Sequence, residues 1–583
     1  MITQNIKPGM AAVTVIAVLA LLVRVWGTSF GLPYDFTADE PHKILQALKI
    51  GAGEGGPLVQ MWHTIGKGGL DYLLFFEYSL LFCFWWVTGK VGGANDFALA
   101  YLTDPSAFYL LGRITVASLG ALTCVAVYGV GRRLYGPRSG LLAALIGALA
   151  LDHATNSHLI NVHIPMACAL WLAVWCYAEY EHRPSNTRLC WTGVLAGLAI
   201  SLAYNAAIGL LMLLLAIAMR RDTVVPLAER VAAAARVLGA ALLTVLLLSP
   251  DLLLGAGALL ENFHQVLGSA AGEPQAPANA TRAAIDAVTI LREQSWRDYL
   301  PILVGWRYLP VMVVALVGGV VGLVRGERWS WLLVGANLLL IAILSAADRG
   351  VSERYMLPMT PALWLLAARG VVALGGRRGW LQALLVFAVV APSAFHIVKM
   401  DYTLTRTDSR VQAKQWLEAQ VPAGARLLVD GMRFRYIQSP PLKPSAAALE
   451  RQIANLHGSE LKDPKRFIDL YRAAKASLPG PSYDLHSTVY GLEVGELDDY
   501  VRACFDYVVT SSDVAERYAA GPLRTAHPRT ARFYDGLRSH PAFREVYRVS
   551  GAPWVAPGPT ITIYAITSAC ANRSQSLPVG QDR

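Results

Sequence analysis

Residues 24–67 read RVWGTSFGLPYDFTADEPHKILQALKIGAGEGGPLVQMWHTIGK and form a polar stretch between two apolar runs. The stretch contains side chains of the kinds found in enzyme active sites. They are the carboxylates of Asp39 and Glu40, the imidazoles of His42 and His63, and the ammonium group of Lys67. Most of the remaining chain has the composition of lipid-soluble helix. We therefore expect the rest of the chain to be a scaffold that holds this loop at one face of a membrane.

The composition is that of a protein with many membrane spans. The 583 residues are 54% hydrophobic and only 16% charged, whereas soluble domains carry about 25% charged residues. The net charge of +10 lies mainly in short basic clusters between apolar runs, such as Arg132-Arg133, Arg220-Arg221 and Arg377-Arg378, which is typical of cytoplasmic loops. No basic stripe interleaved with aromatic residues is present, so we expect no nucleic-acid partner.

A spanning helix needs about 20 mostly apolar residues. Apolar runs occur at about 10–27, 70–92, 109–131, 139–155, 164–179, 190–203, 205–219, 237–253, 301–324, 330–346, 356–374 and 380–397. If 70–92, which contains Asp71 and Glu77, lies along the membrane without crossing it, all the basic loops become cytoplasmic. We therefore predict eleven spans, an uncleaved first span and a cytoplasmic N-terminus. The predicted external segments are 28–108, 156–163, 254–300, 347–355 and everything after 398.

The chain divides at about residue 398. Residues 1–398 are expected to form the membrane domain, and 399–583 a small soluble α/β domain outside the cytoplasm. Segments 426–430 and 505–510 read as short buried strands, and 411–419 as an amphipathic helix. Cys504 and Cys570 share this domain and can form a disulfide if it is extracytoplasmic.

The acidic pair has two compatible interpretations. A carboxylate beside the membrane can take a proton from an acceptor hydroxyl or amine, or bind a metal, and neighbouring carboxylates disfavour joint ionisation. Alternatively, Asp39 is the N-cap of a helix with Pro41 as its first helical residue. Lys67, in a glycine-rich turn, either holds a phosphate or marks the membrane interface.

Two external loops carry further candidates. His153, His158 and His163 recur every five residues, a poor spacing for one helical face, so metal ligation competes with a role as interfacial polar residues. In the other loop, Arg354 can clamp a phosphate while Tyr355 hydrogen-bonds it; the alternative is a salt-bridged loop.

Several motifs follow one another in a characteristic order. They are Asp39-Glu40-Pro41-His42, Lys67-Gly-Gly, Leu111-Gly-Arg113, Gly131-Arg-Arg-Leu-Tyr-Gly136, Gly193-Val-Leu-Ala-Gly197 with Tyr204-Asn205-Ala206, Ser352-Glu-Arg354-Tyr355-Met-Leu-Pro358, and Asp408-Ser-Arg410-x-x-Ala413-x-x-Trp416. In this series the chain resembles the bacterial protein mannosyltransferase-like glycosyltransferases of family 39, which are related to the lipid A aminoarabinose transferases. The resemblance implies a GT-C fold of about eleven transmembrane helices plus juxtamembrane helices.

The resemblance also implies an activity. A sugar would pass, with inversion, from a polyprenyl-phosphate donor to a lipid, glycan or protein acceptor at the outer face of a bacterial inner membrane. Asp39 is the implied base, supported by Glu40, and the donor phosphate would be bound by Lys67, Arg354 and Tyr355. His42, His63, His158 and His163 are candidate substrate or metal contacts.

Two positions depart from the family pattern. His163 stands where an Asp is frequent, and Ala203 stands where a Lys is frequent. A divalent metal ion as cofactor stays open, and so do the sugar and the acceptor.

Two other classes of function compete with this one. A polyprenyl-lipid transporter or flippase would line a pathway with these polar residues, although the chain shows no internal repeat of the kind frequent in transporters. A non-catalytic envelope assembly protein would tolerate changes in the first loop.

Overall fold

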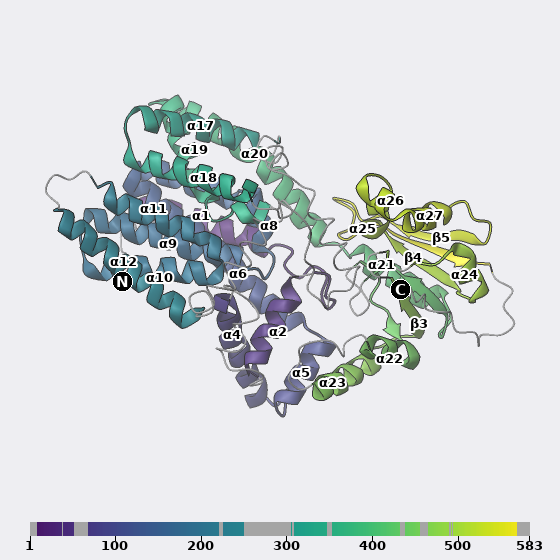
Figure 1. Cartoon of the computed structure of the whole chain (residues 1–583). Coiled ribbons are helices and arrows are strands. Elements are labelled where there is room, and N and C mark those ends of the chain that lie inside the picture. The colour runs from purple at the N-terminus through teal and green to yellow at the C-terminus, as the bar shows by residue number, and fades with distance from the viewer. Residues whose placement is uncertain are drawn as a thin grey trace, which may run out of the picture.

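The computed structural model describes residues 8–37, 39–51, 68–220, 226–249, 305, 308–346, 353–431, 438–454, 464–488, 491–492 and 494–567. Figure 1 shows a helical part joined to a smaller C-terminal part that contains a sheet. The boundary lies at the end of a long helix, α20 (Gly379–Leu404). Lys67, His63, Cys570 and the loop 254–300 lie outside the described residues.

Helices packed side by side make up the helical part (Figure 1). Besides α20, they are α1 (Pro8–Val25), α6 (Ser106–Leu134), α7 (Pro137–Ala148), α8 (Leu151–Ser157), α9 (His163–His182), α10 (Asn186–Leu202), η1 (Tyr204–Ala206), α11 (Ala207–Ala218), α12 (Leu227–Leu248), α17 (Leu309–Val324), α18 (Arg328–Ala346), η4 (Glu353–Met356) and α19 (Thr360–Gly375). Three further helices, α2 (Glu40–Gly51), α4 (Gly68–Val87) and α5 (Ala94–Thr103), lie between this bundle and the C-terminal part.

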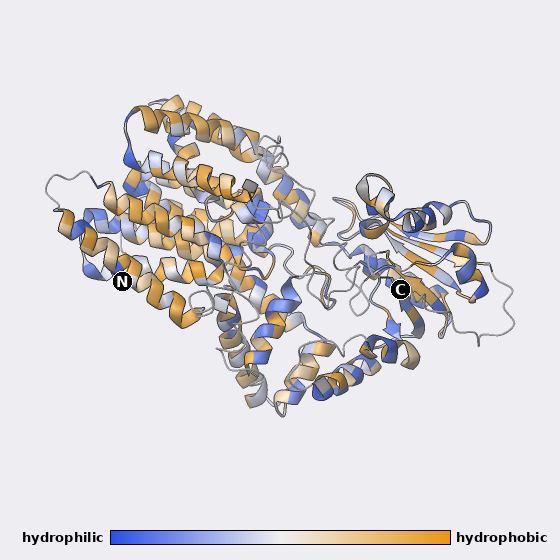
Figure 2. Cartoon of the chain, in the orientation of Figure 1, coloured by the Kyte–Doolittle hydropathy of each residue, from blue (hydrophilic) through white to orange (hydrophobic). Residues whose placement is uncertain are grey.

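The apolar runs of the sequence match these helices closely. Figure 2 shows that hydrophobic residues dominate the bundle, whereas α2 and the C-terminal part are more polar. Within the described ranges, four helices are long and apolar enough to cross a membrane, and five more apolar helices are shorter. The count of eleven spans therefore stays a prediction. Helix α4 is one of the four, so its assignment as a non-crossing helix is untested.

The run 139–155 differs from expectation because it forms two helices. Helix α7 ends at Ala148 and α8 begins at Leu151. The side chain of Arg24 donates hydrogen bonds to the carbonyl oxygens of Gly147 and Ala148, both at 3.0 Å. These carbonyls belong to the last turn of α7, where carbonyl oxygens lose the regular helical partners; the Gly147 oxygen also accepts a hydrogen bond from the Ala150 amide at 3.3 Å. A buried arginine from α1 thus caps the end of α7.

Glycines allow two helices of the bundle to approach closely. A Cβ atom added at Gly193 or Gly197 of α10 would lie 2.4 Å from a backbone carbonyl oxygen of α12. Small residues spaced by four bring helix backbones together in this way. The Gly193–Gly197 motif therefore fixes the contact between α10 and α12.

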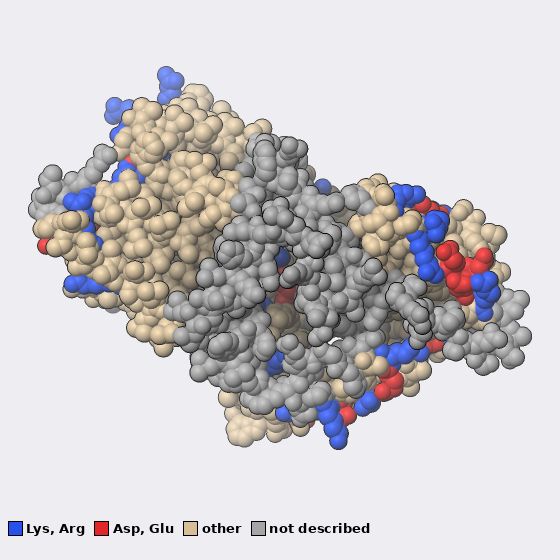
Figure 3. Space-filling view, in the orientation of Figure 1, with Lys and Arg blue, Asp and Glu red and all other residues tan. Residues whose placement is uncertain are grey.

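Basic side chains gather at one end of the bundle. Figure 3 shows Lys and Arg at the end that lies away from the C-terminal part, while the described flank is almost free of charge. Arg133 of α6 pairs with Glu179 of α9 at 2.6 Å, and Arg328 of α18 pairs with Glu181 of α9. The basic loops thus share one end of the bundle, and their cytoplasmic location stays a prediction.

The C-terminal part is an α/β domain built on a six-stranded sheet of order β2-β3-β1-β4-β6-β5. The strands are β1 (Arg426–Val429), β2 (Lys443–Pro444), β3 (Ser482–Ser487), β4 (Tyr507–Ser511), β5 (Phe543–Val549) and β6 (Ile561–Ile566). Strands β1, β3 and β4 are parallel, and β6 is antiparallel to β4 and β5. The predicted strands 426–430 and 505–510 are confirmed as β1 and β4.

Helices cover both faces of this sheet. They are α21 (Ser409–Gln420), α22 (Ala446–Ala454), α23 (Pro464–Ser477), α24 (Leu497–Arg502), α25 (Ser512–Ala515), η5 (Glu516–Tyr518), α26 (Pro522–Ala526) and α27 (Pro528–Gly536). The predicted helix 411–419 is confirmed as α21. Cys504 takes part in a disulfide, whereas the predicted pairing with Cys570 involves a residue that is not described.

Two contacts join the C-terminal domain to the first loop and its neighbours. The guanidinium of Arg410 lies 3.8 Å from the ring centroid of Phe36, just before α2. In addition, Arg466 of α23 donates hydrogen bonds of 3.0 and 2.6 Å to Asn95 of α5. The domain is therefore held against the polar stretch from which the sequence interpretation began.

Candidate active site

Helix α2 presents two different faces. Glu40, Lys43 and Ile44 are buried, whereas Asp39, immediately before the helix, and His42 are exposed. Positions three apart lie on one side of a helix, so Glu40 and Lys43 share the inner face and Asp39 and His42 share the outer one. The helix begins at Glu40, directly after the predicted N-cap Asp39. The prediction that Pro41 is the first helical residue is wrong by one position, because Glu40 already has helical geometry.

The carboxylate of Glu40 is fully engaged by the protein. Arg113 of α6 donates to it from Nε at 2.8 Å and from Nη2 at 2.7 Å. The Thr37 hydroxyl and the Ile160 amide add hydrogen bonds of 2.7 and 2.9 Å. Glu40 is 1% exposed, so these four hydrogen bonds replace its hydration.

The same arginine also holds the loop that precedes α2. Arg113 Nη1 donates to the carbonyl oxygens of Thr28 and Phe30 at 2.7 and 2.9 Å, and its guanidinium lies 4.0 Å from the Phe30 ring centroid. Charges within an apolar bundle need such partners. The pair of Arg113 and Glu40 therefore ties the first loop to α6.

A second buried ion pair fixes the inner face of α2. Lys43 Nζ lies 2.9 Å from Asp71 Oδ1 in the first turn of α4, and both side chains are almost fully buried. Together with the Glu40 pair, this contact determines which way α2 faces. Asp39 is thereby directed away from the packed interior.

Asp39 contacts a residue that is distant in the sequence. Its side chain is 61% exposed and forms an ion pair with Arg354 of η4. The Arg354 guanidinium also lies 5.5 Å from the Tyr355 ring centroid. Burial lowers the pKa of Arg354, but the Asp39 carboxylate and the Tyr355 side chain together outweigh this effect, and the net direction of the pKa is upward.

The surroundings of η4 bring a third segment, the start of α9, to this place. The Tyr355 ring packs edge-on against His163 at the start of α9, with centroids 5.8 Å apart. Asn205 Nδ2 donates to the Tyr355 carbonyl oxygen at 3.4 Å. The structure thus brings together four predicted site residues, Asp39, Arg354, Tyr355 and His163, from three segments.

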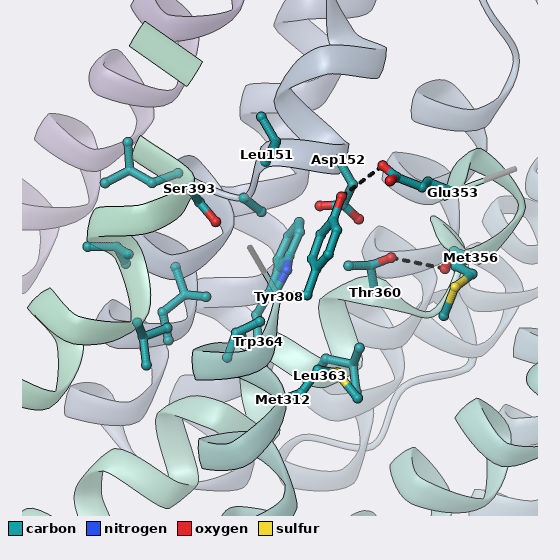
Figure 4. A pocket seen from close by; sticks show the side chains of 16 residues that line it. Leu151, Asp152, Tyr308, Met312, Glu353, Met356, Thr360, Leu363, Trp364 and Ser393 are labelled. Atoms are coloured by element: carbon teal, nitrogen blue, oxygen red, sulfur yellow. Dashed lines mark hydrogen bonds between the residues drawn. The ribbon is translucent and has the colours of Figure 1, made fainter. Parts of the chain in front are cut away.

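A mainly apolar cavity lies behind η4, between α7, α17, α19 and α20. Its polar end is formed by Asp152 and Glu353, and Tyr308 donates a hydrogen bond of 2.8 Å to Glu353 (Figure 4). The cavity volume of about 50 Å³ suits a few water molecules rather than a sugar or a lipid chain. Adjacent residues of η4 therefore have different neighbours: Glu353 lines this cavity, and Arg354 pairs with Asp39.

His158 lies in the interior of the protein. Its ring nitrogens lie 2.9 Å from the Ala154 oxygen and 3.0 Å from the Trp26 oxygen, and Nε2 is 3.2 Å from Asp401 Oδ1. A metal ion would have to displace one of these contacts. Within the described part of the chain, no group of three or more His, Cys, Asp or Glu side chains could hold a metal ion, so we derive no step through a metal.

Several residues that build the site were not recognised from the sequence. Lys43 and Asp71 were not paired, and Asp401 and Phe36 were not singled out. Arg113 was recognised only as part of the Leu111-Gly-Arg113 motif. The available signal was that each charge in an apolar helix needs a partner of opposite sign, but the sequence does not say which of several candidates that partner is.

Comparison with protein families supports the resemblance inferred from the motifs. Residues 110–254 match the model of the dolichyl-phosphate-mannose-protein mannosyltransferase family. The matched segment extends from α6 to just beyond α12, so it contains Arg113 but neither Asp39 nor Arg354. Over this segment the expected resemblance is confirmed. A search of curated proteins gives no significant match.

Two solved structures illustrate what the chain is similar to. ArnT from Cupriavidus metallidurans, bound to undecaprenyl phosphate, has 14% sequence identity and a TM-score of 0.47, covering 94% of this chain and 97% of that one. The archaeal oligosaccharyltransferase AglB from Archaeoglobus fulgidus, in complex with an inhibitory peptide and a dolichol-phosphate, has 12% identity and a TM-score of 0.47, covering 93% and 73%. At these scores neither likeness assigns the fold.

Proposed function

We propose, from the match to the mannosyltransferase family, that the chain is an inverting glycosyltransferase with a GT-C fold. It would transfer a sugar from a polyprenyl-phosphate donor to an acceptor at the outer face of a bacterial inner membrane. The observation that carries the proposal is the pairing of Asp39 with Arg354. These residues lie 315 positions apart, and Asp39 follows shortly after Phe36, which contacts Arg410 of the C-terminal domain.

Asp39 has the properties of a general base. Its carboxylate is exposed, whereas both carboxylate oxygens of the neighbouring Glu40 are already occupied by four hydrogen bonds. As the acceptor oxygen attacks the anomeric carbon, its proton passes to Asp39 and the bond between that carbon and the phosphate oxygen breaks. The electron pair of that bond leaves with the lipid phosphate, and a positioned base contributes about 10²–10⁴-fold to such a step.

Arg354 is suited to the leaving group. A guanidinium can form bidentate hydrogen bonds with phosphate oxygens. Stabilisation of the charge that develops on a leaving group is a large catalytic effect. In the structure without donor, Arg354 is paired with Asp39. A bound phosphate would replace that carboxylate, so donor binding would release the base at the moment when it is needed.

Glu40 and Lys43 are assigned as positioning residues. They hold the inner face of α2 through Arg113 and Asp71, and thereby set the place of Asp39. We retain Lys67 and Tyr355 as further phosphate contacts, and His42, His63 and His163 as candidate contacts of the substrate. The external location of the C-terminal domain is supported by the disulfide at Cys504, since disulfides persist outside the cytoplasm.

The test is reconstitution in lipid with a panel of polyprenyl-phosphate sugars, with release of free polyprenyl phosphate as the measurement. Asp39→Asn should reduce transfer by at least 10²-fold while donor binding is kept. Arg354→Ala should weaken donor binding as well as transfer. Glu229→Gln, at an exposed carboxylate near the start of α12, is the matched control and should transfer normally.

Two results would reject this proposal. If Asp39→Asn transfers sugar at the normal rate, Asp39 is not the base. If the wild-type protein binds no donor of the panel, or binds one and moves it across the bilayer without releasing polyprenyl phosphate, the chain is not a transferase of this class.

A further inference from the structure

The C-terminal domain contains a position at which α/β sheets commonly bind ligands. From β1 the chain passes through α22 and α23 to β3 on one side, and then through α24 to β4 on the other side of β1. Ala448 of α22 packs with Val429 on one face of the sheet, and Tyr500 of α24 packs with Leu428 on the opposite face. The order of strands thus reverses between β1 and β4. Ligands in such sheets bind outside the carboxyl ends of the strands at this point.

A buried carboxylate organises the carboxyl ends of β1 and β4. Asp430 directly follows β1 and is 3% exposed. It accepts hydrogen bonds from the Tyr534 hydroxyl at 2.6 Å, the Ser511 amide at 3.0 Å and the Thr488 hydroxyl at 3.3 Å. These bonds hold Tyr534 of α27 over the edge of the sheet. The Tyr534 ring in turn stacks on Tyr518 of η5, with an interplanar angle of 12°.

A hollow of about 290 Å³ lies beside these two tyrosines, over β4, β6 and β5, and thus next to the reversal point and not at it. Its floor is a polar row across the sheet, because Thr510 of β4 lies opposite Thr562 of β6, which lies opposite Arg548 of β5. Both threonines are 7% exposed. The preceding row on the same face, which contains Val508 and Tyr564, belongs to an apolar cluster. The change from apolar to hydroxyl side chains therefore coincides with the hollow.

The lining indicates the chemistry of the occupant. Hydroxyl groups donate and accept hydrogen bonds alike, and tyrosine rings offer apolar surface beside a polar tip. The charged residues at the hollow are two acidic and two basic, namely Glu516, Asp535, Arg538 and Arg548. Asp535 is already paired with Arg524, at 2.6 Å, and the other three charges are of both signs. The lining therefore offers no large surplus of one sign for a charged ligand, and its hydroxyl groups favour an uncharged ligand rich in hydroxyl groups.

We propose that this hollow is a binding site for a neutral saccharide, separate from the site at Asp39 and Arg354. Tyr518 and Tyr534 supply the apolar wall, and Thr510 and Thr562 supply hydroxyl partners at the floor. The proposal does not rest on transferase activity, because it is argued from the C-terminal domain alone.

The test uses the full chain in lipid nanodiscs, so that no sugar-headed detergent competes, with maltotriose as the probe. Binding is measured by saturation-transfer NMR and calorimetry. We expect saturable binding that Thr562→Val weakens at least tenfold. Thr525→Val, at an exposed threonine on α26 outside the hollow, should bind like the wild type. Asp39→Asn should also bind normally, which separates this site from the proposed donor site.

Three results would contradict the proposal, and one would support it. Absence of maltotriose binding at 10 mM, equal binding by Thr562→Val and wild type, or displacement of maltotriose by an acidic tripeptide at lower concentration would each overturn the proposal. A second floor variant, Thr510→Val, guards against a folding defect at one position. Unchanged thermal unfolding of both valine variants, together with weakened binding, would support it.

Discussion

Replacement by the corresponding amide should have different effects at the adjacent carboxylates: Glu40→Gln should lower stability, and Asp39→Asn should abolish transfer. Glu40→Gln removes the charge that compensates Arg113, whose guanidinium stays buried. Breaking a buried ion pair from one side costs about 3–5 kcal/mol. Asp39→Asn disrupts a pair that is 61% exposed on the Asp39 side, and exposed pairs contribute about 0–1 kcal/mol.

Thermal unfolding in nanodiscs and donor-dependent transfer are the two measurements. At roughly 2–4 °C per kcal/mol for a domain of moderate size, Glu40→Gln should lower Tm by on the order of 10 °C, and Asp39→Asn by no more than a few degrees. Transfer should be lost in Asp39→Asn despite its intact fold. The double variant Glu40→Gln/Arg113→Gln should recover part of the lost Tm, because it leaves no buried charge unpaired.

If Glu40→Gln unfolds at the wild-type temperature but transfers no sugar, Glu40 has a chemical role and is not a positioning residue. If the double variant is less stable than Glu40→Gln alone, the loss of stability comes from the shape of the site and not from an uncompensated charge.

Three further predictions concern other parts of the chain. Gly197→Ala places a Cβ 2.4 Å from an α12 carbonyl oxygen and should cost about 1–3 kcal/mol in thermal unfolding, whereas Gly239→Ala, which meets nothing within 4 Å, should not. Burial raises the pKa of Asp430 to about 6, so the folded domain binds this proton more tightly than the unfolded chain. Stability should therefore fall by roughly 3 kcal/mol as pH rises from about 4 to about 6, and Asp430→Asn should flatten that slope in denaturant titrations. Arg410→Ala removes the contact with Phe36, and hydrogen exchange should become faster in the first loop but not in the sheet.

Much of the helical part could be predicted because apolar runs report directly on lipid-soluble helix. The end of α7 could not, because the break at 148–151 depends on a side chain from α1 that lies far away in sequence. Helix α5 was missed since it is short and only moderately apolar. The strands β1 and β4 were visible as short β-branched and apolar runs. Their parallel pairing and the place of β6 depend on contacts that no local pattern encodes.

The candidate site shows a similar division. Residue type alone identified Asp39 and Arg354, and the order of motifs suggested that both serve one reaction. The sequence could not distinguish Asp39 from Glu40, because both are carboxylates at the start of one helix. Only the periodicity of α2, combined with the position of Arg113, shows that one faces outward and the other is buried. Likewise, five-residue spacing could not reveal that His158 turns inward while His163 packs against Tyr355.

The capping of α7 by Arg24 has a consequence for how the protein is made. Arg24 lies on α1, yet its partners Gly147 and Ala148 are 123 and 124 residues further along. Until α7 has been translated, we expect this charge to stay near the aqueous boundary, where a long side chain can reach water. We therefore expect α1 to reach its final position only after α7 has arrived.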